Sequence, residues 1–307
     1  MHTTISASQP SVRRKLRLLG LDGRTALLVL ALAVVAVLFL WPLFEIARLS
    51  FSPGFTFTNY SDIFGTAAFR TVVVDTFEIA LMVTAVTLVI AVPLAYYIWN
   101  RTGTAKIICL GLLIVPLGTG ILVKNLVWTV LLEGQGVVYD VLHAIGLTSQ
   151  PINILFTRTA VVIGMVHYLL PIAVVPIYSS LTRVDRRLLL AARSLGASRT
   201  ETLRLVTLPM ISPGLVSGTA VIFILSLGFY VTPAMLGGRG DQMIANLVDT
   251  NITELANFPA ASALSLLVVL TVVVFLPLVF KHMGTGQVAG TDALFQPTAA
   301  SHPGEKA

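Results

Sequence analysis

Six apolar segments, each close to the roughly 20 residues that a helix needs to cross a bilayer, divide this sequence. In the hydrocarbon core of a membrane the backbone must satisfy its own hydrogen bonds, which a helix does within one segment. We place the spans at Ala26 to Ile46, Val72 to Trp99, Ile107 to Leu131, Thr159 to Ser180, Gly214 to Leu236 and Ala261 to Phe280. The sequence therefore predicts an all-α membrane protein with six transmembrane helices.

The composition agrees with a membrane protein. Hydrophobic residues make up 56% of the 307 residues and charged residues only 11%, whereas about 25% of a typical soluble domain is charged. The single cysteine, Cys109, can form no intramolecular disulfide and no cysteine-based metal cluster, and we expect no metal site. The net charge of +6 comes from short basic loops, which membrane topology explains better than nucleic-acid binding does.

The first apolar segment has to be distinguished from a signal peptide, because basic residues precede it. It is longer than the apolar core of a signal peptide, which has about 7–15 residues. No small-residue cleavage site follows it before Trp41. We therefore expect a retained span.

The distribution of basic residues predicts the orientation, because short loops rich in Lys and Arg stay in the cytoplasm. If both termini lie in the cytoplasm, most of the 20 Lys and Arg residues lie in cytoplasmic segments. The exceptions are Arg48, Arg70, Lys124, Arg158 and Arg239. We therefore predict a basic cytoplasmic N-terminus in residues 1–25 and a six-helix transmembrane domain in residues 26–281. Residues 282–307 form a cytoplasmic tail with a composition typical of disorder.

Residues 182–212, between the fourth and fifth spans, form the most polar stretch in the second half of the chain. This stretch contains Arg183, Arg186, Arg187, Arg193, Arg199 and Arg204. Strong helix formers predict a helix over residues 186–195 that ends at Gly196. Ser198 and Glu201 have capping-box spacing, which predicts a second helix that runs to Leu208 and stops at Pro209. We therefore predict a helix-turn-helix on the cytoplasmic membrane surface.

This loop resembles the cytoplasmic signature of permease subunits of binding-protein-dependent ABC importers, Glu-Ala-Ala-x3-Gly-x9-Ile-x-Leu-Pro. The matching positions are Ala191, Ala192, Gly196, Ala197, Leu208 and Pro209. Nine residues separate Gly196 from Val206, which takes the place of the Ile. Leu190 stands where the family has Glu, so the polar contact of that Glu is replaced by an apolar side chain that packs within the loop or against a partner.

The resemblance implies that the loop forms coupling helices that dock on a cytoplasmic ATPase dimer. The residues that it assigns to coupling are Leu190, Ala191, Ala192, Leu195, Gly196, Ala197, Leu208 and Pro209. The sequence itself contains no phosphate-binding Gly-x-x-x-x-Gly-Lys-Ser/Thr motif. We therefore expect a transport subunit that is not an enzyme and binds no cofactor, with ATP and Mg²⁺ held by the partner ATPase.

Further segments resemble the spermidine/putrescine branch of these permeases. They are Leu170-Pro171-Ile172, residues 176–181 and residues 227–238. The resemblance implies a multi-pass protein of the plasma membrane, which is the inner membrane in cells with two, and a polyamine-like solute. It also implies an extracytoplasmic substrate-binding protein, a second permease subunit that is usually a different chain, and contact with membrane lipid.

Polar residues in or near the spans are candidates for the solute passage. Asp75 and Glu78 lie three residues apart on one helical face, where they would suit a cation or would be solvated at the interface. Lys124 would pair with a carboxylate, shorten the third span or contact solute, and Tyr230 would line the passage or pack against lipid or helices. We expect His167 to be hydrogen-bonded between helices rather than to relay protons.

Prolines and small residues within the spans indicate where helices bend or pack closely. We expect interruptions, which are tolerated beside protein or an aqueous cavity, at Pro93, Pro116, Pro171, Pro176 and Pro233. Gly214-x-x-x-Gly218 has the spacing that lets another helix, in this chain or in a second subunit, approach closely.

The sequence lacks the marks of two other classes of membrane protein. A secondary transporter driven by an ion gradient would show paired half-repeats, and the sequence contains no such repeat. An intramembrane enzyme would need a constellation such as His-Glu-x-x-His or Gly-x-Ser-x-Gly, and neither occurs. The importer permease is therefore the favoured interpretation, and the secondary transporter is the alternative.

Overall fold

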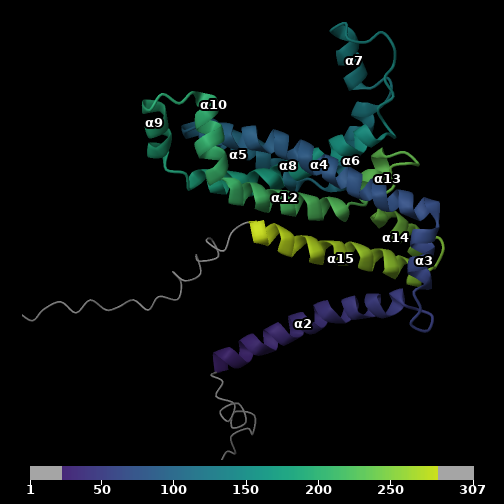
Figure 1. Ribbon diagram of the computed structural model, residues 1–307. Coiled ribbons are helices and arrows are strands. Elements are labelled where there is room, and N and C mark those ends of the chain that lie inside the picture. The colour runs from purple at the N-terminus through teal and green to yellow at the C-terminus, as the bar shows by residue number, and fades with distance from the viewer. Residues whose placement is uncertain (1–22, 283–307) are drawn as a thin grey trace, which may run out of the picture.

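A computed structural model describes residues 23–282, and all regular structure within that range is helical (Figure 1). The helices are α2 (Gly23–Ser50), α3 (Thr58–Gly65), α4 (Ala67–Trp99), α5 (Gly103–Ile114), the 3₁₀-helix η1 (Val115–Gly118), α6 (Ile121–Leu132), α7 (Val137–Ala144), α8 (Arg158–Thr182), α9 (Arg186–Ser194), α10 (Arg199–Thr202), the π-helix η2 (Leu203–Thr207), α11 (Leu208–Met210), α12 (Ser212–Leu227), α13 (Val231–Leu236), α14 (Ile244–Thr253) and α15 (Phe258–His282). The all-α class is confirmed. The predicted disordered tail from residue 283 on and most of the basic N-terminus lie outside the described residues.

Five helices in the described range are long and apolar enough to cross a membrane, and the bent pair formed by residues 199–210 and α12 would make a sixth span. Helices α2, α4, α8 and α15 coincide with the first, second, fourth and sixth predicted spans. The chain is thus a multi-pass membrane protein. The count of six spans and the cytoplasmic position of both termini remain predictions.

The third predicted span, Ile107 to Leu131, is wrong as one continuous helix. Helix α5 ends at Ile114, one 3₁₀ turn follows, and α6 begins at Ile121. Pro116 has no N–H to continue the α-helical pattern, and the glycines that follow it favour a turn over a helix.

The fifth predicted span, Gly214 to Leu236, is also interrupted. Helix α12 ends at Leu227, and α13 begins at Val231. A helix continued through this break would bring the ring of Pro233 against the carbonyl group of Phe229. As the third residue of α13, Pro233 instead occupies a first-turn position whose N–H has no intrahelical partner.

The other prolines do not interrupt their spans, contrary to expectation. Pro93 lies inside the 33 residues of α4, and both Pro171 and Pro176 lie inside α8. Each proline removes one backbone hydrogen bond, and the packing of α4, α8 and α12 against one another stabilises the helices in spite of this loss.

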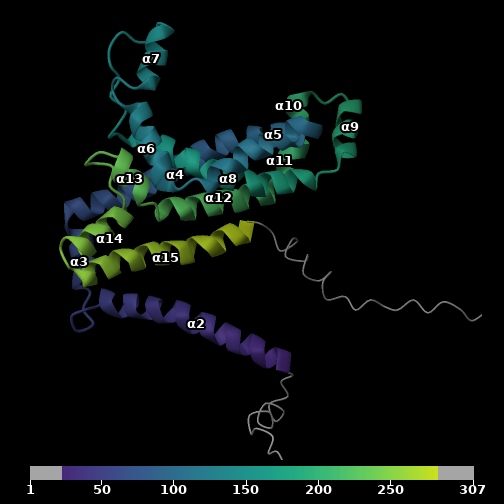
Figure 2. The same ribbon diagram turned by 180° about the vertical axis from the view of Figure 1, so that it is seen from behind.

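Helices α4, α8 and α12 pack side by side and form the main core (Figures 1 and 2). The glycine pair of α12 makes the approach to α8 possible. A Cβ atom at Gly214 would lie 2.6 Å from the carbonyl oxygen of Pro176, and one at Gly218 would lie 3.5 Å from the Pro176 ring. The small-residue spacing predicted from the sequence is therefore used within this chain.

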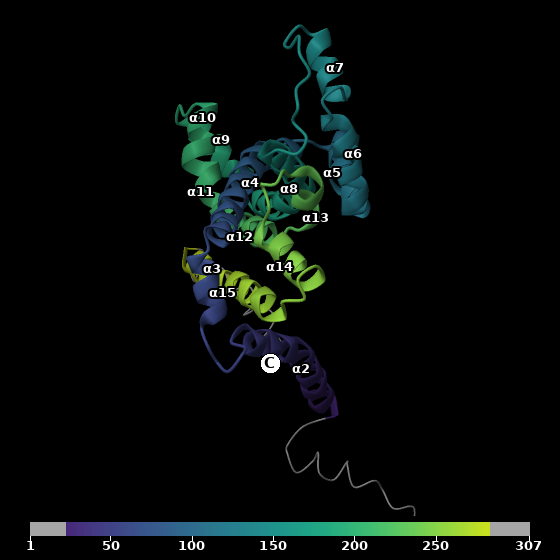
Figure 3. The same ribbon diagram turned by 90° about the vertical axis from the view of Figure 1, so that its right-hand side faces the viewer.

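The long helices give the molecule two ends. The α9 end, as we call it, carries the last residue of α4, Trp99, together with the helices from α9 to α11 and the end of α15 (Figure 1). The α14 end carries the first turns of α4 and α8 together with α3, α13 and α14 (Figure 1). Helix α7 projects from the rest of the molecule, and α2 packs against α15 with its apolar surface exposed (Figure 3).

Candidate functional site

The turn at the α9 end has the geometry that the sequence predicts. Helix α9 is capped by Asp185, whose carboxylate accepts a hydrogen bond from the Arg187 backbone N–H at 2.8 Å. Gly196 follows the helix with a φ of +90°, a conformation that side chains disfavour. Its N–H donates to the Arg193 carbonyl oxygen at 3.0 Å, which closes the end of the helix.

The second helix begins as predicted but does not end as predicted. Ser198 and Glu201 form a capping box, with hydrogen bonds of 2.8 Å and 3.2 Å between each side chain and the other residue's N–H. The helical run then continues past Pro209 to Met210, so Pro209 does not stop it. The π-helix η2 just before Pro209 widens the backbone, which gives the proline ring room. After Ile211 the chain bends by 68° into α12.

Large apolar side chains of this loop face outward. Leu195 is 89% exposed and Leu190 is 62% exposed, and Leu188 and Leu205 are exposed with them. Among the predicted coupling residues, those exposed are Leu190, Ala191, Leu195, Gly196 and Pro209. The others, Ala192, Ala197 and Leu208, are half-buried, and Leu208 packs against the main core. Exposed apolar side chains gathered on one loop are typical of an interaction surface.

A cluster of charged residues ties three segments together at the α14 end. Arg158, the first residue of α8, lies 2.6 Å from Asp75 and 2.9 Å from Glu78, both on α4. Its Nε also donates to Asp241, in the loop between α13 and α14, at 3.2 Å. One guanidinium therefore faces three carboxylates. The Asp75 side chain is only 13% exposed, whereas that of Glu78 is 53% exposed.

The sequence pattern placed Asp75 and Glu78 on one helical face but gave no indication of Arg158 or Asp241. Asp241 also accepts a hydrogen bond from the Gly238 N–H at 3.1 Å, and the Ile244 N–H donates to the Thr76 hydroxyl at 2.9 Å. These contacts fix the loop before α14 against α4 and α8. The glycines that surround Arg239 are the only local sign of this close-packed loop.

Lys124 lies deeper, on α6, and is 8% exposed. Its ammonium group lies 4.7 Å from the centre of the Tyr168 ring on α8, an arrangement in which a cation is attracted to the ring face. Among the described residues, no carboxylate forms an ion pair with Lys124. One turn further along α6, the Trp128 indole N–H donates to Nδ1 of His167 at 3.1 Å. The expected interhelical hydrogen bond of His167 is therefore confirmed.

Tyr230 lies between α12 and α13 and borders a polar cavity of about 300 Å³ at the α14 end. Its hydroxyl donates to the carboxylate of Asp249 on α14 at 2.9 Å. Other residues that line the cavity are Gly238, Arg239, Gln242, Asn246 and Thr250. Tyr230 thus lies on a polar cavity wall, next to the loop that carries Asp241.

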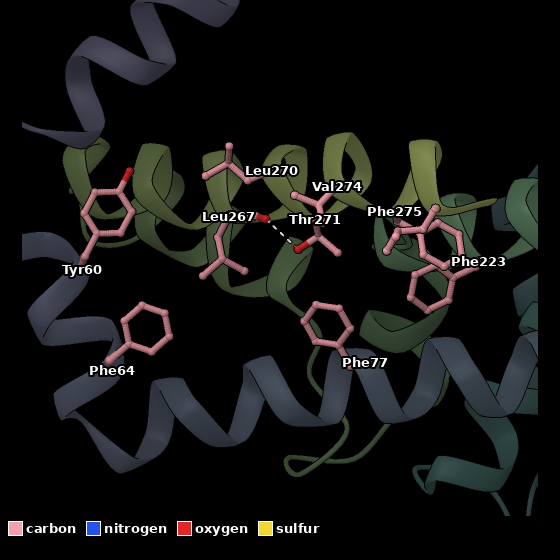
Figure 4. A pocket seen from close by; sticks show the side chains of 10 residues that line it. Tyr60, Phe64, Phe77, Phe223, Leu267, Leu270, Thr271, Val274 and Phe275 are labelled. Carbon is pink, nitrogen blue, oxygen red and sulfur yellow. Dashed lines mark hydrogen bonds between the residues drawn. The ribbon is translucent and has the colours of Figure 1, made fainter. Parts of the chain in front are cut away.

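A larger cavity, of about 520 Å³, opens between α15 and helices α3 and α4 (Figure 4). Its lining is Tyr60, Phe64, Phe77, Phe223, Leu267, Leu270, Thr271, Val274, Phe275 and Leu278. The Thr271 hydroxyl donates to the Leu267 carbonyl oxygen within α15, at 2.9 Å. Because this lining contains no charged side chain, the cavity suits hydrocarbon chains of lipid better than a charged solute.

Known proteins are similar to this chain in sequence and in fold. Residues 25–282 match the family model described as "Binding-protein-dependent transport system inner membrane component". The chain is 32% identical over 224 residues to the spermidine/putrescine transport system permease protein PotB of Escherichia coli (strain K12). The alignment covers 73% of this chain and 80% of PotB. PotB of Haemophilus influenzae is 30% identical over 211 residues, or 69% of this chain and 73% of that relative.

A solved structure has a similar fold. A chain of the bacterial alginate ABC transporter, crystallised in complex with an alginate pentasaccharide-bound periplasmic protein, matches with a TM-score of 0.70. The match covers 89% of this chain and 95% of that chain, at 16% sequence identity. At this identity the likeness concerns the fold alone.

Proposed function

The chain belongs to the family of binding-protein-dependent transport system inner membrane components, and we propose that it is the membrane-spanning permease subunit of an ABC importer. The family match agrees with the resemblance inferred from the loop around Gly196. In the proposed complex a cytoplasmic ATPase dimer binds ATP and Mg²⁺, and this chain binds no cofactor. An extracytoplasmic binding protein delivers the solute, and a second permease subunit, a different chain, completes the passage.

The observation that carries this proposal is the exposed apolar surface of the loop from α9 to α11. Leu190 and Leu195 are large, apolar and exposed on a loop that also carries six arginines. Burying such side chains against a partner stabilises the contact by about 1.5–3 kcal/mol for each leucine. Arg193 and Arg199, which are exposed on either side of the turn at Gly196, would add attraction to an acidic rim on the ATPase.

The orientation of the complex follows from the charges. The α9 end carries the six arginines of the loop, so we place this end in the cytoplasm and the α14 end outside. This orientation puts the coupling surface where a soluble ATPase can reach it. It also puts the polar cavity at Tyr230 on the side from which a binding protein delivers solute.

We favour a polyamine-like solute. PotB, which matches 73% of this chain, supports this choice by its name as a spermidine/putrescine permease protein. The charge of the α14 end supports it as well, because Asp75, Glu78 and Asp241 together outnumber the guanidinium of Arg158. An excess of carboxylates attracts a cationic solute toward the passage.

Within the passage we assign solute contacts to Asp75, Glu78, Lys124 and Tyr230. Glu78 is the carboxylate of the pair that solvent reaches, and Tyr230 lines a polar cavity. Lys124 lies deeper, between α6 and α8, where its positive charge would repel a cation and so limit how long it stays. The solute would therefore meet negative charge first and positive charge later.

Reconstitution tests the proposal. The chain is co-expressed with its ATPase, second permease subunit and binding protein, and radiolabelled putrescine uptake is measured in proteoliposomes. We expect uptake that requires ATP and stops when the ATPase carries a substitution that blocks hydrolysis. Uptake that continues with the inactive ATPase and follows an imposed ion gradient would instead support a secondary transporter. Calorimetric titration of the binding protein with putrescine and spermidine tests the solute separately.

A further inference from the structure

Arg186, the first residue of α9, contacts the last residue of α4, Trp99. The Arg186 Nη2 donates to the backbone carbonyl oxygen of Trp99 at 3.0 Å, across 87 positions of sequence. The guanidinium carbon also lies 4.8 Å from the centre of the Trp99 ring. Two contacts of different kinds, one to the backbone and one to the ring, therefore join the same two residues.

Trp99 is a firm point of attachment. It is the last residue of α4, so its carbonyl group has no partner within the helix and lies at the negative end of the helix dipole. A cation that caps this carbonyl group is favoured because it supplies the missing hydrogen bond and lies at the negative end of the helix dipole. The Trp99 side chain is buried in the main core, with its ring 5.8 Å from that of Tyr96.

Other arginines on α9 have no such contact. Within the described residues, Arg187 and Arg193 have exposed side chains that form no hydrogen bond, ion pair or ring contact. All three arginines share the same short helix and the same charge. Arg186 therefore differs from its neighbours in its attachment and not in its chemistry.

Helix α4 connects this contact with the opposite end of the molecule. Its 33 residues form one unbroken helix, which corresponds to about 50 Å at 1.5 Å per residue. Asp75 and Glu78, which meet Arg158, lie near the far end of the same helix. Because α4 is unbroken between Trp99 and the charged cluster, a displacement of Trp99 can be passed along the helix to the α14 end.

The chain offers only one covalent route from α9 into the membrane helices that precede it, through residues 183–185 to α8. Helix α4 is separated from α9 along the chain by the helices from α5 to α8, so without a direct contact it would follow α9 only through its packing against α8. Arg186 supplies a direct connection. With it, a force on α9 moves α4 and α8 together.

We propose that Arg186 transmits movement of the coupling loop to α4, and through α4 to the charged cluster around Arg158. Arg186 is thus a positioning residue that acts on the passage without touching solute. The inference rests on the proposed function, because it requires that an ATPase moves α9. It adds a division of labour in which exposed leucines of the loop bind the ATPase and Arg186 transmits its motion.

The test compares R186A with R187A, its neighbour on the same helix, in the complete reconstituted complex. Three quantities are measured: co-purification of the ATPase, ATP hydrolysis, and putrescine taken up per ATP hydrolysed. For R186A we expect normal co-purification and an uptake-to-hydrolysis ratio that falls at least about 5-fold, the lower range of typical coupling energies. R187A should change the ratio by less than about twofold.

Two more variants make the outcome decisive. R186K keeps a charge that can cap the Trp99 carbonyl, and should recover part of the ratio. W99L keeps the carbonyl and removes the ring, and should give an intermediate ratio. Three outcomes would overturn the proposed role of Arg186. They are an unchanged uptake-to-hydrolysis ratio in R186A, an equal fall of this ratio in R187A, and lost co-purification of the ATPase in R186A. Failure of both R186A and W99L to assemble, with R187A normal, would show a contact that holds the fold and would overturn it too.

These outcomes are distinct from failure of the proposed function. If the unsubstituted complex shows no ATP-dependent uptake, the proposed function itself fails, whatever the variants do. If it shows such uptake and R186A keeps the full ratio, the importer function stands and the role of Arg186 does not.

Discussion

Arg158 and Asp75 form an ion pair of 2.6 Å that joins the first turn of α8 to α4 at the α14 end. The pair is largely shielded from solvent, and its loss would leave Asp75 beside Glu78 and Asp241 without a counter-ion. Removing one partner of a buried pair costs more than the pair contributes, because the remaining charge is left unsatisfied. Arg158 is thus a structural centre of this end of the molecule.

We predict that Arg158→Gln lowers the free energy of unfolding by about 2 kcal/mol, below the range for fully buried pairs because solvent partly screens this cluster. Arg158→Lys should cost less, since it keeps the charge but loses the forked geometry that serves three carboxylates. Thermal unfolding of the purified protein in detergent measures both. Arg239→Gln, at the same end on an exposed residue, serves as the control. Equal melting temperatures for the Arg158 and Arg239 variants would contradict this account.

The sequence predicts contacts between residues that are close along the chain but not contacts between residues that are far apart. Ser198 and Glu201 are three positions apart, so the capping box depends on local spacing alone and was predicted. Arg158 and Asp75 are 83 positions apart, and no local pattern connects them. The attachment of Arg186 to Trp99 likewise joins residues 87 positions apart and depends on how α4 and α9 pack.

The errors at prolines have the same origin. Pro116 and Pro93 look alike in apolar sequence, but α5 ends just before Pro116 and α4 continues through Pro93. Gly118 and Gly120, which follow Pro116, make a turn favourable, whereas α4 packs against both α8 and α12 and stays helical. The π-helix before Pro209 widens the backbone and lets the helical run continue through this proline. Helix propensities of the residues do not predict this adjustment.

The contact between α12 and α8 predicts a graded response to alanine. At Gly214 an added Cβ atom would lie 2.6 Å from the Pro176 carbonyl oxygen, and the Ser180 side chain would be closer still. We expect Gly214→Ala to destabilise the protein by about 2 kcal/mol through overpacking. Gly218→Ala should be tolerated, because its nearest neighbour would lie at 3.5 Å, an ordinary contact distance.

Gly111→Ala provides the control for this series, since no atom lies within 4 Å of the added Cβ and alanine favours the helix. Melting temperatures of the three variants in detergent give the ranking. A Gly214 variant as stable as the Gly111 variant would mean that α8 and α12 separate at little cost.

Gly196 predicts a separation between folding and coupling. Gly196→Pro fixes φ near −65° where the turn requires +90°, and it removes the N–H that bonds to Arg193. We expect the variant to reach the membrane at normal levels but to lose co-purification of the ATPase and uptake. Gly146→Pro is the matched control, because Gly146 has a φ of +75° and donates to His143 after α7, far from the loop. Full coupling in the Gly196 variant would mean that the shape of this turn does not matter for docking.

The exposed leucines of the loop lead to a prediction that separates this chain from its relatives. Leu195 is 89% exposed, so Leu195→Glu should leave the melting temperature unchanged. If Leu195 is buried against the ATPase, the charge should weaken that contact at least about tenfold, because burial of a leucine contributes about 1.5–3 kcal/mol. Affinity is measured by titrating the detergent-purified protein with the ATPase.

Leu190→Glu should behave differently, since it introduces the residue that the related signature carries at this position. We expect affinity within about threefold of the original, because the ATPase surface that receives a Glu in relatives tolerates a carboxylate there. Leu147→Glu, at an exposed leucine after α7, controls for the added charge and should leave ATPase affinity unchanged. A Leu195 variant that binds normally would remove the main support for docking through this face. A Leu190 variant that loses as much affinity as the Leu195 variant would show that the ATPase of this system has adapted to an apolar side chain.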